Sequence, residues 1–138
     1  MARTTPITIT ELRDTRERIA NVAKAVALIP ASVSDDHLVL LGGYVRVGDL
    51  RKLVPALAAL QQEIRDRRAG SRVTQIETLR QIAAQIEPTA QAGNRMYAMN
   101  GSGWINLAPG AEVRVSDLRA TGAAHRMLAK EIRRRDAA

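Results

Sequence analysis

Apolar residues recur at helical spacing along residues 8–29, which indicates an amphipathic helix. The apolar stripe comprises Leu12, Thr15, Ile19, Val22, Val26 and Ile29, which are three or four residues apart. Side chains at this spacing lie on one face of an α-helix and can be buried together. Thr8, with Glu11 three residues later, has the pairing of a capping box. We therefore expect a helix that begins after Thr8 and buries one face.

A second stretch, residues 74–87, carries the same pattern. Thr74 and Glu77 form another capping-box pair at its start. The apolar positions that follow are Ile76, Leu79, Ala83 and Ile86. Pro88 and Gly93 come next, and both residues disfavour a helix interior. We expect them to disturb this second helix.

Short extended segments follow the first predicted helix. Residues 37–41 and 44–47 are rich in β-branched and aliphatic side chains and flank Gly42-Gly43. Glycine tolerates the positive φ that a two-residue hairpin turn requires. This segment therefore predicts a β-hairpin.

The second predicted helix is followed by a similar set of strands. These are residues 95–99 and 104–108 around the turn residues 100–103, and then residues 111–115 after Pro109-Gly110. The second half thus has one predicted strand more than the first. We expect Tyr97 and Trp104 to face one another across the hairpin and complete the core.

Each hairpin leads into another predicted helix. Gly48-Asp49 and Ser116-Asp117 are suitable N-caps, and each pair follows a predicted strand directly. Pro55 and Gly122 then stand at nearly the same place in the two segments. We expect a short helical turn, a break, and a longer helix that ends near residue 68 in one segment and near residue 135 in the other.

An internal repeat relates the two halves of the chain. Residues 45–51 (VRVGDLR) recur as residues 113–119 (VRVSDLR), and at this offset of 68 there are 12 identities in the 24 positions from 45 to 68. A repeat at fixed spacing indicates duplication of a structural unit. The sequence predicts an α+β protein made of two tandem α-β-β-α repeats, residues 1–72 and 73–138, joined at residues 69–72. We expect the apolar stripes of both repeats to share one core, so that the chain forms one pseudo-symmetric domain.

The amino-acid composition excludes several classes of protein for this chain. The chain has 138 residues and no cysteine, which excludes a disulfide scaffold, a thiol nucleophile and a Cys-ligated metal. No stretch approaches the length of a membrane span, and the first ten residues lack the apolar run of a secretory signal. The expectation is a cytoplasmic protein that does not contact membranes. Arginine accounts for 18 of the 21 basic residues, as is typical of a GC-rich bacterial or phage genome.

The sequence contains no recognisable catalytic constellation. The only histidines are His37 and His125. Asp35-Asp36-His37 has metal-binding side chains, but we interpret it as a turn or cap before a strand. The glycine clusters lack the spacing of phosphate-binding loops and are interpreted as hairpin turns. We therefore expect a non-enzymatic protein without a cofactor or a metal.

The net charge of +7 is concentrated in two equivalent segments. Residues 48–72 hold six basic and three acidic residues, and residues 111–138 hold seven basic and four acidic, so each segment contributes +3. In the second segment Arg119, Arg126, Lys130, Arg133 and Arg134 fall on one face of the predicted last helix. In the first segment the comparable face is weaker, and Arg65, Arg68 and Arg72 gather at the end of the helix.

Two hypotheses for function remain open. A basic stripe can follow a phosphate backbone, so the first hypothesis is an accessory protein that contacts DNA or RNA through the last helix and the residues just named. The alternative is an assembly or interaction protein, such as a virion component or a binder of an acidic protein surface, which forms homo-oligomers. An ordinary solvated helix face explains the stripe equally well.

The repeated Asp-Leu-Arg has two interpretations of its own. Arg51 and Arg119 can form a paired anion-binding device, or each can make a local structural contact while the aspartate caps a helix. Repetition shows only that a backbone frame was reused. We favour the structural interpretation.

Overall fold

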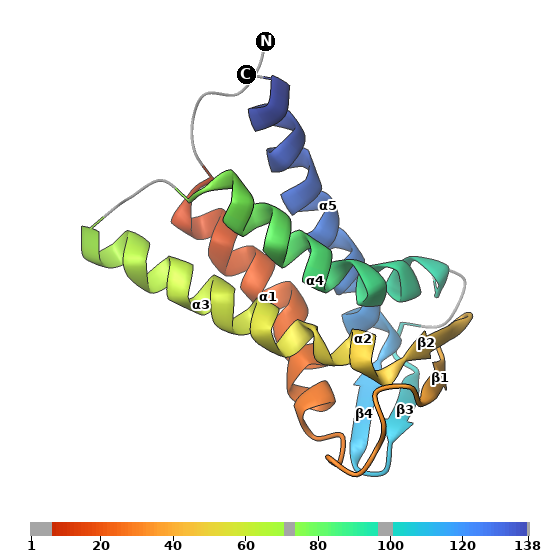
Figure 1. Cartoon of the computed structure of the whole chain (residues 1–138). Coiled ribbons are helices and arrows are strands. Elements are labelled where there is room, and N and C mark those ends of the chain that lie inside the picture. The colour runs from red at the N-terminus through yellow and green to blue at the C-terminus, as the bar shows by residue number, and fades with distance from the viewer. Residues whose placement is uncertain (1–6, 71–73, 97–100, 138) are drawn as a thin grey trace.

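Five helices and two β-hairpins make up the computed structural model, which describes residues 7–70, 74–96 and 101–137 (Figure 1). In chain order the elements are α1 (Ile9–Ala27), β1 (Leu38–Leu40), β2 (Tyr44–Arg46), α2 (Val47–Arg51), α3 (Leu53–Gly70), α4 (Ile76–Arg95), β3 (Trp104–Ala108), β4 (Ala111–Arg114) and α5 (Val115–Ala137). Each hairpin is a two-stranded antiparallel sheet. The prediction of an α+β protein is confirmed. Within the described residues, no helix combines the length and apolar character needed to cross a membrane.

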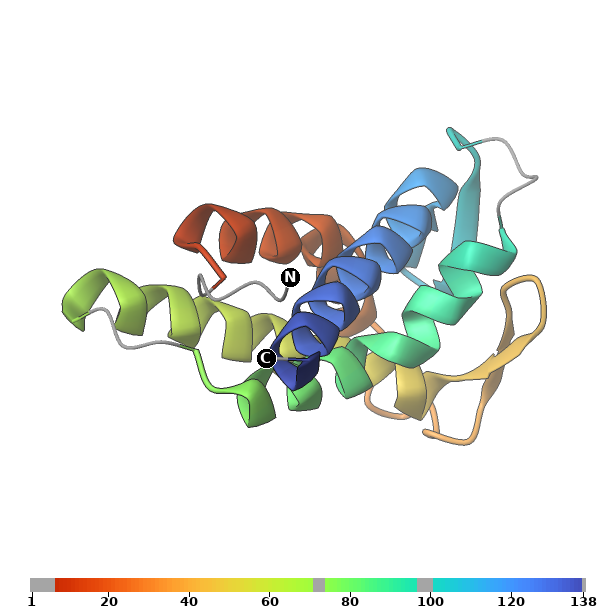
Figure 2. The same ribbon diagram turned by 90° about the horizontal axis from the view of Figure 1, so that it is seen from above.

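The four long helices enclose one core. Helix α1 packs mainly on α3 and α4 packs mainly on α5, while α1 also contacts α5 and α3 contacts α4 (Figure 2). The apolar cluster between them includes Ile19 of α1, Leu60 of α3, Ile86 of α4 and Leu128 of α5, all fully buried. Burial of such side chains contributes about 1.5–3 kcal/mol each, so these stripes stabilise the fold.

Both hairpins lie at the same end of the molecule, opposite the C-terminal end of α3 (Figure 1). The β1–β2 hairpin contacts α4, and the β3–β4 hairpin contacts α1. Each hairpin therefore packs against the first long helix of the other half of the chain.

The two predicted capping boxes have different outcomes. At α1 the box is confirmed: Thr8 Oγ1 accepts from the Glu11 amide, and Glu11 Oε1 accepts from the Thr8 amide. At α4 it is wrong, because the N-cap is Gln75 and no side chain caps the helix. Thr74 is buried instead, where its hydroxyl accepts from Arg67 and its carbonyl accepts from Arg135.

The prediction that Pro88 and Gly93 disturb the second helix is also wrong, since α4 runs through both of them. Gly93 lies where α4 crosses α5, and a Cβ there would stand 2.0 Å from the carbonyl oxygen of Leu118. Close approach of two helices therefore explains this glycine. The packing of α4 against α5 maintains the helix past the proline.

The first hairpin is confirmed with a small correction to its turn. Strands β1 and β2 pair Leu38 with Arg46 and Leu40 with Tyr44. The turn has three residues rather than two, because the Leu41 amide donates to the Gly43 carbonyl at 2.8 Å. Gly42 has φ of +70°, the left-handed conformation that favours glycine.

The second hairpin differs from the prediction. Arg95 is the last residue of α4 and Met96 caps that helix, so these two residues do not begin a strand. The partner of β3 is β4, reached through Pro109 and Gly110, whose φ is +80°. Residues 97–100, which include the rest of the predicted strand and Tyr97, lie outside the described residues. The part of the second half that is described has two strands, as does the first half.

The predicted break in the last helix of each half occurs only once. Helix α2 ends at Arg51 and α3 begins at Leu53, so Pro55 stands in the first turn of α3, where its missing N–H costs nothing. Helix α5 continues through Gly122, which keeps its N–H and lies within contact of Asn94 on α4. The short helical turn predicted for the second half is wrong.

Candidate interaction surface

Three cations of α5 form its exposed basic face. Arg126, Lys130 and Arg133 are exposed and make no ion pair with any described residue. Arg126 Nη1 donates to Asn94 Oδ1 of α4 at 2.9 Å, which holds its charge near the surface. Seven residues separate Arg126 from Arg133, so the face extends about 10.5 Å along the helix. We call these three residues the α5 cationic face.

The other two residues of the predicted stripe are engaged by the fold. Arg119 is half-buried, and its Nε and Nη2 donate to the carbonyl oxygen of Met96 at 3.2 and 2.9 Å. Arg134 is also half-buried and lies 3.9 Å from the buried carboxylate of Glu131. The structure therefore brings three of the five together as a free cationic surface and assigns Arg119 and Arg134 to local contacts.

The candidate residues of the first half do not form a comparable surface within the described residues. Arg65 is exposed on α3 and donates from Nη2 to Gln62 Oε1 at 2.8 Å. Arg68 belongs to α3, but its side chain lies outside what the structure describes, as does Arg72 altogether. The exposed positions of α3 that correspond to Arg126 and Lys130 at the repeat offset are Ala58 and Gln62.

The contacts of Arg51 and Arg119 agree with the local role predicted for the arginines of the repeated Asp-Leu-Arg. The predicted cap is wrong for the first copy, because α2 begins at Val47 with Arg46 as its N-cap, and Asp49 lies inside the first turn. Arg51 Nη2 donates to the Pro30 carbonyl at 3.0 Å, and Nη1 pairs with Asp35 at 2.5 Å. Arg119 makes a similar contact with a main-chain carbonyl after α4, that of Met96. Each arginine ties the start of a hairpin-linked helix to the segment after the preceding long helix.

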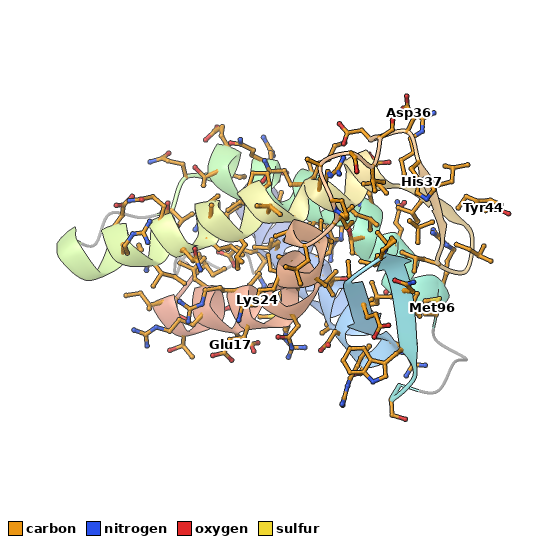
Figure 3. The ribbon with its side chains drawn as sticks, turned by 90° about the horizontal axis from the view of Figure 1, so that it is seen from below. Glu17, Lys24, Asp36, His37, Tyr44 and Met96 are labelled. Carbon is orange, nitrogen blue, oxygen red and sulfur yellow. The ribbon has the colours of Figure 1, made fainter. Side chains whose placement is uncertain are left out.

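Exposed apolar side chains gather on the β1–β2 hairpin. Leu38, Leu40 and Tyr44 are all exposed, and they share one face of the ribbon with Arg46. Tyr44 is 72% exposed and points away from the body of the protein (Figure 3). Val39 and Val45, on the opposite face, are buried. This surface was not predicted from the sequence, although apolar residues on both faces of a strand indicate it.

Trp104 does not complete the core, contrary to the prediction. It is 59% exposed, and the Arg114 guanidinium lies over its ring at 4.9 Å from the ring centre. The two residues are register partners across the β3–β4 hairpin. A cation above an aromatic face is attracted by the ring quadrupole, which stabilises this arrangement at the surface.

A groove of about 490 Å³ lies between α1 and the β3–β4 hairpin. Its lining residues are Asn21, Lys24, Ala25, Leu28, Trp104, Glu112, Val113, Arg114, Ser116 and Asp117. We call this the tryptophan groove. Lys24 on its α1 side is exposed (Figure 3) and makes no ion pair with any described residue.

A smaller groove of about 240 Å³ lies between α4 and the β1–β2 hairpin. It is lined by Leu38, Tyr44, Val45, Arg46, Asp49, Pro88, Gln91 and Arg95. Leu38 occupies the place that Trp104 has in the other groove, because it is the register partner of Arg46 as Trp104 is of Arg114.

The residues of Asp35-Asp36-His37 do not converge on a common point. Asp35 pairs with Arg51, and Asp36 lies 3.8 Å from Arg46. The His37 carbonyl accepts from the Val47 amide. In the described ranges, no group of three or more histidine and carboxylate side chains is placed to hold a metal ion.

Comparison with known proteins gives no match: no family model, no curated protein and no solved structure is similar to this chain. The interpretation of its function therefore depends on the surfaces described above.

Proposed function

We propose that this protein is a nucleic-acid-binding accessory protein whose α5 cationic face contacts the phosphate backbone of DNA or RNA. One observation carries the proposal: Arg126, Lys130 and Arg133 are exposed side by side and have no carboxylate partner in the described chain. Their span of about 10.5 Å corresponds to about three phosphates of one strand, at 3.4 Å of helix axis each.

We also propose that the two halves, residues 1–72 and 73–138, are copies of one α-β-β-α unit. The contacts of Arg51 and Arg119 support this proposal, because both donate to a main-chain carbonyl in the segment after a long helix, Pro30 after α1 and Met96 after α4. The buried glutamates Glu63 and Glu131 support it as well, since they occupy equivalent positions and are each 3% exposed.

Duplication strengthens the functional argument, because it separates cations that the fold uses from cations that it does not use. Arg51 and Arg119 recur in both halves and make equivalent contacts. Arg126 and Lys130, in contrast, replace Ala58 and Gln62. A unit that folds with alanine and glutamine at these exposed positions does not need cations there, which favours a role in binding.

The test is a variant that gives α5 the residues of α3, Arg126→Ala with Lys130→Gln. Binding of a labelled duplex is measured by fluorescence anisotropy across a salt series. The intact chain should show a slope of log affinity against log salt of about −3, and the variant about −1, because each lost phosphate contact removes about 0.9. Affinity at low salt should fall at least tenfold.

The matched control removes the same charge elsewhere, by Arg16→Gln with Arg65→Gln on α1 and α3. We expect the control to bind within about twofold of the intact chain. Equal losses in both variants would show that net charge alone drives binding and would overturn the role of the α5 cationic face. Undetectable binding of duplex DNA and RNA by the intact chain at low salt would overturn the function itself.

A second function is favoured by the apolar face of the β1–β2 hairpin. An exposed apolar patch bordered by arginines is typical of a protein-binding site, and Leu38, Leu40 and Tyr44 form such a patch beside Arg46. The net charge of +7 opposes binding of a second copy, so we propose a protein partner with an acidic surface.

Light scattering of the purified chain, with and without Leu40→Ser and Tyr44→Ser, tests this second function. A monomer that binds an acidic protein, and loses that binding in the double variant, supports it. A closed homo-oligomer that the same substitutions dissociate contradicts it, and shows instead that the patch covers a second copy.

A further inference from the structure

Trp104 is the only tryptophan of the chain, and its large ring stands largely in solvent. Burial of a tryptophan side chain is strongly favourable. An exposed ring at the edge of a groove therefore indicates a surface where binding of a ligand would be stabilised by burial of the ring. Arg114 holds one face of the ring at 4.9 Å and lines the same groove. The ring is thus oriented before any ligand arrives.

The charges around the groove have a definite arrangement. Lys24 and Arg114 supply two cations, neither of them in an ion pair with a described residue. Asp117 stands in the first turn of α5, where the helix N-terminus stabilises its charge, and its Oδ1 accepts from Asn21 Nδ2 at 3.2 Å. Glu112 adds a second carboxylate to the lining. The groove therefore offers cations for a phosphate and carboxylates for amino groups.

We infer that the tryptophan groove binds an unpaired nucleotide, with its base stacked on Trp104 and its phosphate on Lys24 and Arg114. Stacking on an aromatic side chain combined with nearby cations is how proteins hold single-stranded nucleic acid. The carboxylates suit a base with an exocyclic amine, such as cytosine, because a carboxylate accepts from that group. This inference rests on the proposed function and names the single strand as part of its substrate.

The groove and the α5 cationic face lie on different sides of α5. Asp117 lines the groove, and Arg126 follows nine residues later, which at 3.6 residues per turn places it on the opposite side of the helix. Arg126 contacts α4 through Asn94, whereas the groove is closed by α1. Variants of one surface should therefore leave the other intact.

Because the chain has a single tryptophan, its fluorescence reports directly on base stacking in the groove. The intact chain is titrated with a short oligocytidylate and, separately, with a duplex, while tryptophan emission is recorded. We expect saturable quenching by the single strand and none by the duplex, because only an unpaired base can stack on the ring. Binding of both the labelled single strand and the labelled duplex is followed in parallel by fluorescence anisotropy, which does not depend on the tryptophan and therefore also serves the Trp104→Leu variant.

Two variants give the groove the residues of its smaller counterpart. Trp104→Leu copies Leu38, and Lys24→Gln replaces the lysine on α1 with the type of side chain, that of Gln91, which lines the smaller groove from α4. Each should lower single-strand affinity about tenfold, as expected for loss of one stacked base or one phosphate contact, and leave duplex affinity within about twofold. Val54→Ala is the control, since it removes an exposed apolar side chain that lies outside the tryptophan groove and outside the other proposed interaction surfaces, and it should change neither affinity.

The outcomes separate the inference from the function on which it rests. Two results would contradict nucleotide binding in the tryptophan groove: binding of both nucleic acids without quenching, or an unchanged single-strand affinity in Trp104→Leu. Neither result contradicts phosphate binding by the α5 cationic face. Quenching by the single strand without duplex binding supports nucleotide binding in the tryptophan groove and contradicts the proposed contact of the α5 cationic face with a duplex. Quenching by an acidic peptide but not by the oligonucleotide identifies a protein ligand and overturns the inference.

Discussion

Arg119 donates two hydrogen bonds, from Nε and Nη2, to the carbonyl oxygen of Met96, the residue that caps the C-terminal end of α4. A guanidinium placed there stabilises the negative end of the helix and ties α5 to α4. The charge of Arg119 is consequently used inside the fold, although the sequence pattern groups this residue with the α5 cationic face.

Arg119→Ala should lower the free energy of unfolding by about 1–3 kcal/mol, the usual contribution of hydrogen bonds from a charged group. It should leave duplex affinity within about twofold, because the side chain is not free to reach a phosphate. Urea denaturation and anisotropy measure the two effects. Arg126→Ala is the comparison, with the opposite result: stability within about 0.5 kcal/mol and reduced affinity. Reduced affinity in a stable Arg119→Ala variant would contradict the structural role.

Gly93→Ala should destabilise the protein, although alanine is favoured over glycine inside a helix by about 1 kcal/mol. The added Cβ would stand 2.0 Å from the Leu118 carbonyl oxygen, so α4 and α5 must separate. We expect a net loss of about 1–3 kcal/mol, measured by thermal and urea unfolding. Gly101→Ala is the control, because its Cβ would meet nothing closer than 3.4 Å. A more stable Gly93→Ala variant would refute the close crossing.

Glu131→Ala should cost about 3 kcal/mol of stability. The carboxylate is 3% exposed and lies 3.2 Å from Arg135 Nε and 3.9 Å from Arg134 Nη1. Removal of one member of a buried ion pair leaves the other charge without compensation. Glu87→Ala, at an exposed position of α4, should change stability by less than about 0.5 kcal/mol. Chemical denaturation of both variants checks the difference.

Nucleic-acid binding should be transferable from α5 to α3 if the two halves are copies. In the Arg126→Ala, Lys130→Gln background, adding Ala58→Arg with Gln62→Lys places two cations at the equivalent exposed positions. The salt dependence of duplex binding should return to nearly that of the intact chain, since the number of phosphate contacts is restored. A slope that stays near −1 would show that the α5 contact depends on features α3 lacks.

The two halves should not fold separately. Each hairpin packs against the first long helix of the other half, and α1 contacts α5. Fragments 1–72 and 73–138 should each show weak helical circular dichroism alone and regain it on mixing. Cooperative unfolding of either isolated fragment would contradict this prediction and would assign each half its own core.

Local features were the most predictable from sequence. The capping box of Thr8 and Glu11 depends only on contacts within one helical turn, and it forms as expected. The β1–β2 hairpin likewise follows from the β-branched and aliphatic residues of its strands and from glycine at the turn, with one extra residue in that turn. The site was partly predictable, because helical spacing identified Arg126, Lys130 and Arg133 as neighbours.

The failures occur where a contact with another helix or strand decides the outcome. The sequence predicts Thr74 as a helix cap, but its hydroxyl accepts from Arg67 and its carbonyl accepts from Arg135. The sequence predicts Trp104 as a core residue. Pairing of β3 with β4 instead places it on the outer face of the hairpin, where the Arg114 guanidinium lies over its ring.

The sequence by itself determined the helix faces, the first hairpin, the excess of positive charge and its concentration in residues 48–72 and 111–138, because these depend on residue type and spacing alone. Only the tertiary structure decided which cations are free. Arg119 and Arg126 are seven residues apart on one face of α5, and both contact the end of α4. Arg119 is half-buried against the main-chain carbonyl of Met96, whereas Arg126 donates to the exposed side chain of Asn94 and stays at the surface. Spacing along a helix places side chains on a face, and packing against a neighbouring helix determines which of them reach solvent.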